Sequence, residues 1–532
     1  MKRYITGVAV AGALIMGACV DLDVSNPNEP DRARVLTSPG DVQSLISTSY
    51  RAYFDNAQQT NPGLPTAAMA DNLTGGFFDF GVHDLTTEPR TIFDSSPLNT
   101  RGFVGRAPWS RLYPVLSNVN DGLKAIEDGL VIQLEPDGPD HTARARAFGK
   151  FIQGITLGYL ALYYDQALIV TEDSDLELLD PTDFRPYPEV QQLALDILDE
   201  AIQIAQANSF TLPGSNDWIN GLPLTNTQLV QVINSYYARL LVYMPRTWEE
   251  RNQVDWGEVM ARIDAGITED FAPQGELDIW ESNMRRLYAR VRARPSDHVR
   301  PDYMAFGPGD VSGGFQTWFA APSANRMPFQ MDTPDRRIQG PDGPDSPGTY
   351  LGYNENNIWP ESRGTYRWSH YYYLRDGVGD SWFTGPQVTM SRTEMDLLKA
   401  EALIRLGGAA DAVDLINATR VANGELPPVT LDGPPDEASC VPKKMDGSCG
   451  SLWDALMYER NLENMGIEGT IMWWDARGLE RLQEGTLLHF PVSGIELENL
   501  GLPLYTFGGV GGNGAAPVPQ YHRCPVALPR CG

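Results

Sequence analysis

Apolar residues recur at helical spacing in pairs of segments that irregular stretches separate. In the clearest stripe, apolar residues occupy positions 190, 194, 197, 198, 201 and 205. Intervals of three and four residues place these side chains on one face of a helix. The pattern predicts paired helices at about 38–54 with 112–126, 143–164 with 190–205, 228–243 with 256–267, and 392–406 with 409–420.

Local signals support the ends of these helices. Ser38 or Asp41 can cap the first one, because their side-chain oxygens accept hydrogen bonds from free backbone N–H groups. Gly407 and Gly408 allow a sharp turn within the last pair. Helix pairs of this size are typical of a TPR-like stack, although the standard TPR signature is absent. The helical pattern alone therefore predicts a mostly α fold of paired helices.

The segment 295–390 differs from the rest of the chain. It holds 23 glycines or prolines and 16 aromatic residues, so it is richer in aromatics than the chain as a whole, at 10%. Disordered segments are poor in aromatic residues, and long loop-rich insertions in compact proteins are usually functional or disordered. We therefore expect an ordered, packed and loop-rich insertion with a functional role.

Charge narrows the range of partners. The chain has 41 basic and 69 acidic residues, a net charge of −28. Such a body repels phosphate backbones, which argues against nucleic acid as a partner. With 42% hydrophobic and 21% charged residues, the composition is that of a globular protein.

The N-terminal segment predicts export. Lys2 and Arg3 precede the apolar stretch Ile5 to Met16, which ends in Gly17-Ala18 directly before Cys19. This order resembles a bacterial lipoprotein signal, with Met16 at a position where leucine is usual. It predicts a signal peptide over 1–18.

The predicted mature chain starts at a lipidated Cys19 and continues in a linker over 19–37. Two or three acyl chains anchor a protein stably, at about 0.8 kcal/mol per buried CH₂. Val20 stands where an aspartate would favour retention in the inner membrane, so we expect an outer-membrane protein. The alternative is a plain secreted protein. No other apolar run approaches the roughly 20 residues that cross a membrane.

The remaining cysteines form two close pairs, Cys440 with Cys449 and Cys524 with Cys531. An exported protein meets an oxidising environment, so disulfides are expected, and of the three possible connectivities we favour the local one. The spacings are not those of a zinc ribbon and histidine is scarce, with 6 in all. No metal site and no cofactor are expected.

Several motifs, in this order, resemble the SusD/RagB family of outer-membrane nutrient-binding lipoproteins. Cys19 followed by Asp21-Leu22-Asp23-Val24 is similar to the family's N-terminal entry, and Ala143 to Tyr164 to its first TPR helix. The family's most recognisable block is matched by Arg392-Thr393-Glu394 through Ala400-Glu401-Ala402, Gly407, and Ile416 to Arg420.

Two C-terminal blocks extend the resemblance. Leu452 to Gly469 with Asp475-Ala476-Arg477 looks like the family's ER…E…EG…D..R stretch, and Pro491-Val492 with Glu496-Leu497 like its final motif. Two positions depart from the family pattern: Asp165-Gln166-Ala167 replaces a Gly-x-x-Pro turn, and Ile471 stands where the family has arginine.

The resemblance implies an α-superhelix of four TPR-like hairpins with a loop-rich second half. It implies one SusD-like domain over 38–532, with helix pairs at about 38–270 and 390–422, a ligand-binding insertion at about 295–390 and a C-terminal segment at 440–532. It also implies a SusC-like TonB-dependent outer-membrane barrel as partner. The ligand is most often a glycan and sometimes another polymer or a peptide, and the family is not catalytic.

Sugar rings present apolar C–H faces and polar edges, so their sites need aromatic platforms beside amides, carboxylates or arginine. The family draws its ligand site from loops in about two places, which we carry onto this sequence. The candidate ligand residues are Asp71, Asn72, Phe77, Phe78, Trp109, Tyr303, Gln316, Trp318 and Phe319. Phe78, Trp318 and Phe319 would stack on rings, and Asp71, Asn72 and Gln316 would take hydroxyls. The alternative for each aromatic residue is core packing, which we also expect for Tyr371-Tyr372-Tyr373 and Trp473-Trp474.

Two other features have ordinary explanations. The arginine run between Arg285 and Arg300 is typical of a solvated helix face, with an anionic ligand or a barrel contact as the alternative. Asp137-Gly138-Pro139-Asp140 and Asp342-Gly343-Pro344-Asp345 lack the ligand pattern of a calcium loop and are typical of turns.

The competing function is a secreted α-helical glycoside hydrolase, which would need two carboxylates about 5–9.5 Å apart. With 69 acidic residues such pairs are unavoidable, so the sequence does not test this reading. Gly-x-Ser-x-Gly, His-Glu-x-x-His and Walker motifs are absent. A third reading, a structural surface protein, would leave the aromatic loops buried. We expect a non-enzymatic protein that binds an oligosaccharide or peptide.

Overall fold

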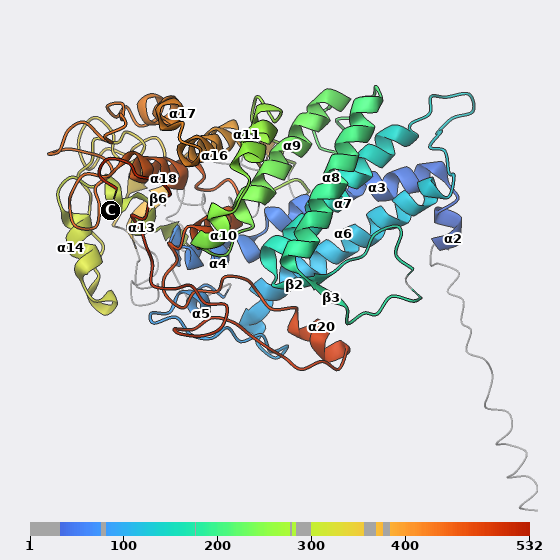
Figure 1. Ribbon diagram of the computed structural model, residues 1–532, viewed down its shortest axis with the longest axis horizontal. Helices are drawn as coiled ribbons and strands as arrows, with labels where there is room; N and C mark the ends of the chain where they lie inside the picture. Colours follow the sequence, from blue (N-terminus) through green and yellow to red (C-terminus); the bar gives the residue numbers. More distant parts are fainter. Residues whose placement is uncertain are drawn as a thin grey trace, which may run out of the picture.

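The computed structural model describes residues 32–75, 81–175, 177–276, 279–282, 299–355, 369–375 and 384–531. Its largest part is a stack of helices in which each packs against the next (Figure 1). These helices are α3 (Pro39–Ala57), α6 (Phe103–Glu127), α7 (Thr142–Tyr163), α8 (Tyr187–Ala207), α9 (Asn226–Tyr243), α11 (Trp256–Asp264), α16 (Arg392–Arg405) and α17 (Ala409–Ala422). The mostly α fold of four helix hairpins is therefore confirmed.

The helix ends follow the local signals of the sequence. The Ser38 side chain accepts a hydrogen bond from the Asp41 N–H group, so Ser38 caps α3. Gly407 has a φ of +86°, which forms the turn between α16 and α17. The one large difference is α6, which begins at Phe103 instead of about 112, with Pro108 and Pro114 inside it.

Helix α7 lies at the centre of the stack. It packs against α3, α6, α8 and α9, and from Ala147 to Tyr163 every residue is buried. The apolar stripe of α8 faces it, and the residues of the sequence pattern from Val190 to Ala205 are buried. Together with neighbouring rings such as Tyr50 and Trp280, these residues form one large hydrophobic core.

Short elements connect the long helices and build the rest of the molecule. The helices are α2 (Arg32–Val35), α4 (Thr60–Met69), α5 (Val82–Thr86), α10 (Trp248–Asn252), α13 (Tyr303–Phe306), α14 (Gly314–Ala320), α18 (Leu452–Glu463), α19 (Gly469–Gly478) and α20 (Gly494–Asn499). The described residues also form the 3₁₀ turns η1 (Thr100–Gly102), η3 (Gly307–Gly309) and η4 (Ser323–Asn325). The C-terminus lies beside the start of α18, where Cys531 contacts Ser451 (Figure 1).

The strands form three antiparallel pairs in the described part of the chain. They join β1 (Leu73–Gly75) to β4 (Val299–Pro301), β2 (Gln166–Leu168) to β3 (Phe184–Pro186), and β5 (Leu351–Tyr353) to β6 (Tyr371–Tyr373). Two of these pairs, β1–β4 and β5–β6, belong to a second hydrophobic core together with α4, α13, α14 and α18.

The described residues from Val299 to Tyr353, with Tyr371 and Tyr373, contribute to this second core, whereas Met390 belongs to the first one. Tyr371 and Tyr373 are buried, and so are Trp473 and Trp474 of α19, which belong to the first core. The expected turns are present as well, with positive φ at Asp137 and Gly343.

The structure pairs the cysteines locally, Cys440 with Cys449 and Cys524 with Cys531. In the ranges that the structure describes, no helix has the length and apolar character needed to span a membrane. The same ranges contain no cluster of three or more histidine, cysteine or acidic side chains suited to a metal ion. Cys19, Phe77, Phe78 and the arginines 285–294 lie outside the described residues.

Candidate functional site

The β1–β4 pair joins the two segments in which the sequence places ligand residues. Leu73 pairs with Pro301, and the Asp302 N–H donates to the Asn72 carbonyl at 3.0 Å. The end of α4 and the start of α13, more than 200 residues apart in sequence, therefore lie side by side. Helix α13 begins here because the Asp302 carboxylate accepts from the Met304 N–H group at 2.8 Å.

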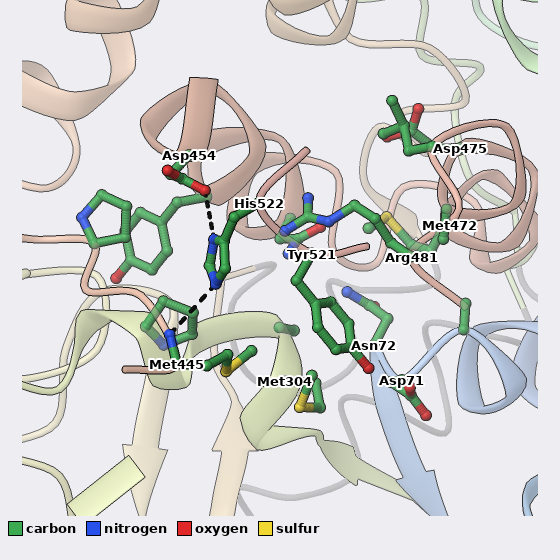
Figure 2. A pocket seen from close by; sticks show the side chains of 18 of the residues that line it. Asp71, Asn72, Met304, Met445, Asp454, Met472, Asp475, Arg481, Tyr521 and His522 are labelled. Carbon is green, nitrogen blue, oxygen red and sulfur yellow. Dashed lines mark hydrogen bonds and ion pairs between the residues drawn. The ribbon is translucent and has the colours of Figure 1, made fainter. Parts of the chain in front are cut away.

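A small cavity of about 60 Å³ opens at this junction. Its walls come from the β1 and α13 segments, from α18 and α19, and from the C-terminal segment (Figure 2). The lining residues include Asp71, Asn72, Met445, Asp454, Asp475, Arg481, Tyr521 and His522. One water occupies about 10–15 Å³ of such space, so the cavity has room for a few waters or one polar group of a ligand.

Asn72 offers hydrogen-bonding capacity inside the cavity. It is 2% exposed, and neither its amide oxygen nor its amide nitrogen has a hydrogen-bond partner in the described chain. Its neighbour Asp71 accepts from Arg90 at 3.2 Å, and burial lowers the pKa of Arg90 to about 10. A buried amide without partners is costly, so the site is suited to a group that donates and accepts.

Arg481 adds a cation to the same cavity. Within the described residues its guanidinium forms no ion pair and no side-chain hydrogen bond, and burial lowers its pKa. Asp454 and Asp475 are the acidic groups that most favour its charge. An arginine without a bidentate partner is free to bind hydroxyls or a carboxylate.

His522 forms a fixed part of the wall. Its Nδ1 lies 2.8 Å from a carboxylate oxygen of Asp454, and its Nε2 accepts from the Met445 N–H at 3.3 Å (Figure 2). This pair of contacts fits the neutral ring with the proton on Nδ1. Burial raises the pKa of Asp454, but the contact with His522 and the donors of Ser451 outweigh it and leave the pKa below its ordinary value.

Two further predicted residues lie near the cavity wall. The Gln316 side chain donates to the Lys444 carbonyl at 3.1 Å, next to the lining residue Lys443. Phe319 is half-buried and meets Tyr521 edge to face, with ring centroids 6.0 Å apart. The structure thus brings four predicted residues, Asp71, Asn72, Gln316 and Phe319, to one region.

Two predicted platforms are core residues instead. Tyr303 is fully buried, its ring stacks on Phe329 at 4.6 Å, and its hydroxyl donates to the Phe329 carbonyl. Trp318 is 4% exposed, with Phe315 stacked on its ring and the Arg326 guanidinium 5.0 Å from its centroid. Neither ring has a free face for a sugar, because protein groups already occupy these faces.

Trp109 lies apart from the cavity. It belongs to α6 and contributes to a separate groove of about 600 Å³ with Tyr113 and Phe184. Phe77 and Phe78 fall outside the described residues, so their proposed role stays a prediction.

Arg481, Tyr521 and His522 were absent from the candidates chosen on sequence. All three belong to the segment 440–532, which carries no helical stripe in their vicinity. Arg481 follows the Asp475-Ala476-Arg477 motif by four positions, and this was the one available signal.

Comparison with known proteins places the fold. No family model matches the sequence, and no curated protein matches it. Among solved structures, a SusD superfamily protein from Bacteroides vulgatus ATCC 8482 aligns with a TM-score of 0.51 at 14% identity, over 84% of this chain and 89% of the other. A SusD superfamily protein from Bacteroides fragilis gives 0.53 at 14% identity, over 87% and 98%.

A SusD-like protein from Bacteroides fragilis NCTC 9343 aligns with a TM-score of 0.50 at 12% identity, over 83% of this chain and 86% of the other. Structural alignments at such low sequence identity establish the fold but do not identify the ligand. The chain therefore has the SusD-like fold that the order of its motifs predicts.

Proposed function

We propose that this protein is a cell-surface lipoprotein that binds a nutrient glycan and delivers it to a SusC-like TonB-dependent barrel in the outer membrane. One observation carries the proposal. In a chain with a SusD-like fold, the β1–β4 pair brings both predicted ligand segments to one cavity, where the buried Asn72 amide has no partner in the described chain.

The chemistry around the cavity suits the edge of a sugar. Asn72 offers a donor and an acceptor, Arg481 offers donors, and Phe319 offers a half-buried ring beside the lining residue Tyr521. Saccharide hydroxyls need donors and acceptors in this mixture, and ring faces need an aromatic surface. The cavity would hold one polar group of the ligand, with the rest of the glycan outside it.

The anchor and the partner belong to the same proposal. Cys19 would carry the lipid after removal of 1–18, and 38–532 would form the single ligand-binding domain at the cell surface. The net charge of −28 continues to argue against nucleic acid.

The three carboxylates that line the cavity favour binding over catalysis. Asp71 is paired with Arg90, Asp454 with His522, and Asp475 with Arg251 at 3.0 Å. A glycosidase acid needs a raised pKa, whereas that of Asp454 is lowered. We expect no release of reducing ends from any glycan that the protein binds.

The ligand proposal is tested by calorimetry on the full chain in detergent micelles, with maltoheptaose, xylohexaose, laminarihexaose and a casein peptide digest. We expect binding of at least one oligosaccharide, weakened about tenfold or more in Arg481→Met, since hydrogen bonds to a charged group contribute about 1.5–3 kcal/mol. Arg523→Met is the control, because Arg523 lies in the same segment and pairs with Glu480 at the surface. Binding of peptides alone, or an equal loss in both variants, would overturn the proposal.

The anchor and the barrel are tested together in cells. Mass spectrometry of the mature protein should find acyl groups on Cys19, and affinity purification should recover a TonB-dependent barrel. Cys19→Ser should release the protein from the membrane fraction. Recovery of the native protein in the medium without acyl groups contradicts the proposal.

A further inference from the structure

A second cavity, of about 600 Å³, lies between α6, the β2–β3 pair and the start of α20. One face of α6 supplies its floor through Phe103, Arg106, Trp109, Ser110, Tyr113 and Pro114. Leu168 and Phe184 form one side, and Ser493, Ile495 and Glu496 form the other. The volume lies within the range of about 300–1,000 Å³ that small-molecule sites occupy. We call this cavity the α6 groove.

The floor of the α6 groove is rigid. The Tyr164 hydroxyl accepts from the Trp109 N–H at 2.7 Å and donates to the Gly105 carbonyl at 2.8 Å, so it is inserted into the hydrogen-bond ladder of α6. Trp109 packs edge to face on both Tyr164 and Phe184, at 5.0 and 6.0 Å. The ring positions are therefore set before any ligand arrives, which lowers the entropic cost of binding.

Another tyrosine, Tyr113, connects strand β2 to the floor of the groove by hydrogen bonds. The Tyr113 hydroxyl accepts from the Leu168 N–H at 2.8 Å and donates to the Leu168 carbonyl at 3.0 Å. Trp109 and Tyr113 lie 4.7 Å apart, so two aromatic rings stand next to one another on the floor. At the edges Phe103 and Ile495 remain open, with exposed fractions of 41% and 42%.

Polar groups stand at the rim of this apolar floor. Within the described chain, the Glu496 carboxylate has no ion pair or hydrogen bond, and the buried Arg106 Nε has no acceptor. The Arg106 guanidinium is itself held in place by the Pro97 and Asn99 carbonyls. Pro114 has no N–H group, so the Ser110 carbonyl receives no helical hydrogen bond from position 114.

We propose that the α6 groove is a second ligand site, which binds a neutral saccharide of two or three rings. The aromatic floor receives a C–H face of the sugar, and Glu496 and Arg106 receive its hydroxyls. A neutral sugar is favoured over an acidic one, because the rim carries an unpaired carboxylate and the whole chain has a charge of −28. The site extends the proposed function but does not depend on the cavity of Figure 2, which Trp109 does not line.

The test measures binding of maltotriose, xylotriose and mannotriose to the full chain by saturation-transfer NMR and calorimetry. Ser110→Trp fills the groove from an exposed position on α6, and Glu496→Gln removes the charge at the rim without changing its shape. We expect at least one trisaccharide to bind, with an affinity loss of about tenfold or more in Ser110→Trp and a smaller loss in Glu496→Gln. Ser44→Trp, at an exposed serine of α3, is the matched control and should leave binding unchanged.

The outcomes separate this site from the proposed function. Failure of all three trisaccharides to bind overturns the α6 groove, while binding of longer glycans that Arg481→Met weakens leaves the proposed function intact. An equal loss in Ser110→Trp and Ser44→Trp also overturns the groove. Loss in Ser110→Trp alone, with Arg481→Met unaffected, supports the groove as an independent site.

Discussion

The helix stack and the loop-rich half of this molecule are held together in different ways. In the stack, helices satisfy their own backbone groups and pack apolar stripes against the neighbouring helices. In the loop-rich half, much of the chain lacks regular structure, and buried side chains supply the missing bonds. Arg337 is the clearest example, fully buried and bonded to Asp335 at 2.8 Å and to Glu463 at 3.0 Å.

The Arg337 network links the loops to the helices. Asp335 belongs to the loop-rich half, whereas Glu459 and Glu463 belong to α18, and Arg337 bonds all three. A helix stack depends on many equivalent apolar contacts, so it tolerates the loss of one. A loop region held by a few charged groups is more sensitive to a single change, because the partners that remain are buried without compensation.

The largest effect is expected for Arg337→Met, which removes the cation at the centre of the Arg337 network. Removal of the cation leaves buried carboxylates unpaired, which costs about 3–5 kcal/mol of unfolding free energy. We expect hydrogen exchange to rise in 299–355 more than in α7. Urea unfolding with hydrogen-exchange mass spectrometry measures both.

Arg185→Met is the control, because Arg185 forms a surface pair with Glu189 in which the two side chains are 45% and 50% exposed. Such an exposed pair contributes little to stability, so this variant should resemble the parent. Equal loss of protection in α7 and in the loops after Arg337→Met would contradict the comparison.

Charged residues are also buried against the helix stack. The pH dependence of the unfolding free energy tests whether they affect its stability. Glu468 precedes α19 and accepts from Tyr159 and Arg239 at 3.1 and 3.2 Å. Burial, reinforced by Glu394, raises its pKa to about 7 despite Arg239. Protonated Glu468 is therefore favoured in the folded state.

The sign of the pH effect follows from this shift. Between the unfolded pKa of 4.5 and the folded pKa of about 7, the native state binds more protons than the unfolded state, so the Glu468 contribution to stability falls as pH rises. The full loss is about 3 kcal/mol on the scale of 1.36 kcal/mol per pKa unit. Glu468→Gln should remove it, so its stability relative to the parent should rise from pH 5 to 8. Parallel stability curves for the two proteins would refute this account.

The same contrast explains what the sequence could predict. The stripes of α8, α16 and α17 are local, so the sequence locates these helices within about three residues. Helix α6 is longer than predicted, because Pro108 and Pro114 are residues that usually interrupt a helix and so argued against helix in its first turns. The order of family motifs predicted the SusD-like fold as well, since it samples nearly the whole chain.

The site was only partly predictable. Asp71 and Asn72 reach the cavity through β1–β4 pairing, which no local pattern reveals. Tyr303 and Trp318 are core residues instead of ligand platforms. The sequence did not predict this, because composition alone does not distinguish an aromatic platform from an aromatic core. His522 lies in a segment without periodicity, and its ring is held by a contact with Asp454, which is 68 residues away in the sequence. Contacts of this kind depend on tertiary structure and leave no trace in residue spacing.

The smallest expected effect concerns the packing of the stack itself. A Cβ at Gly158 of α7 would lie 2.5 Å from a terminal carbon of Leu240 on α9, so the absence of a side chain lets these helices approach closely. Gly158→Val should cost about 1–3 kcal/mol by overpacking. Gly40→Ala in the first turn of α3 meets nothing within 4 Å and should stabilise by up to about 1 kcal/mol through helix propensity. Thermal unfolding of both variants measures the difference; if Gly158→Val is as stable as Gly40→Ala, the stack is looser than a close-packed core, and its contrast with the loop-rich half is lost.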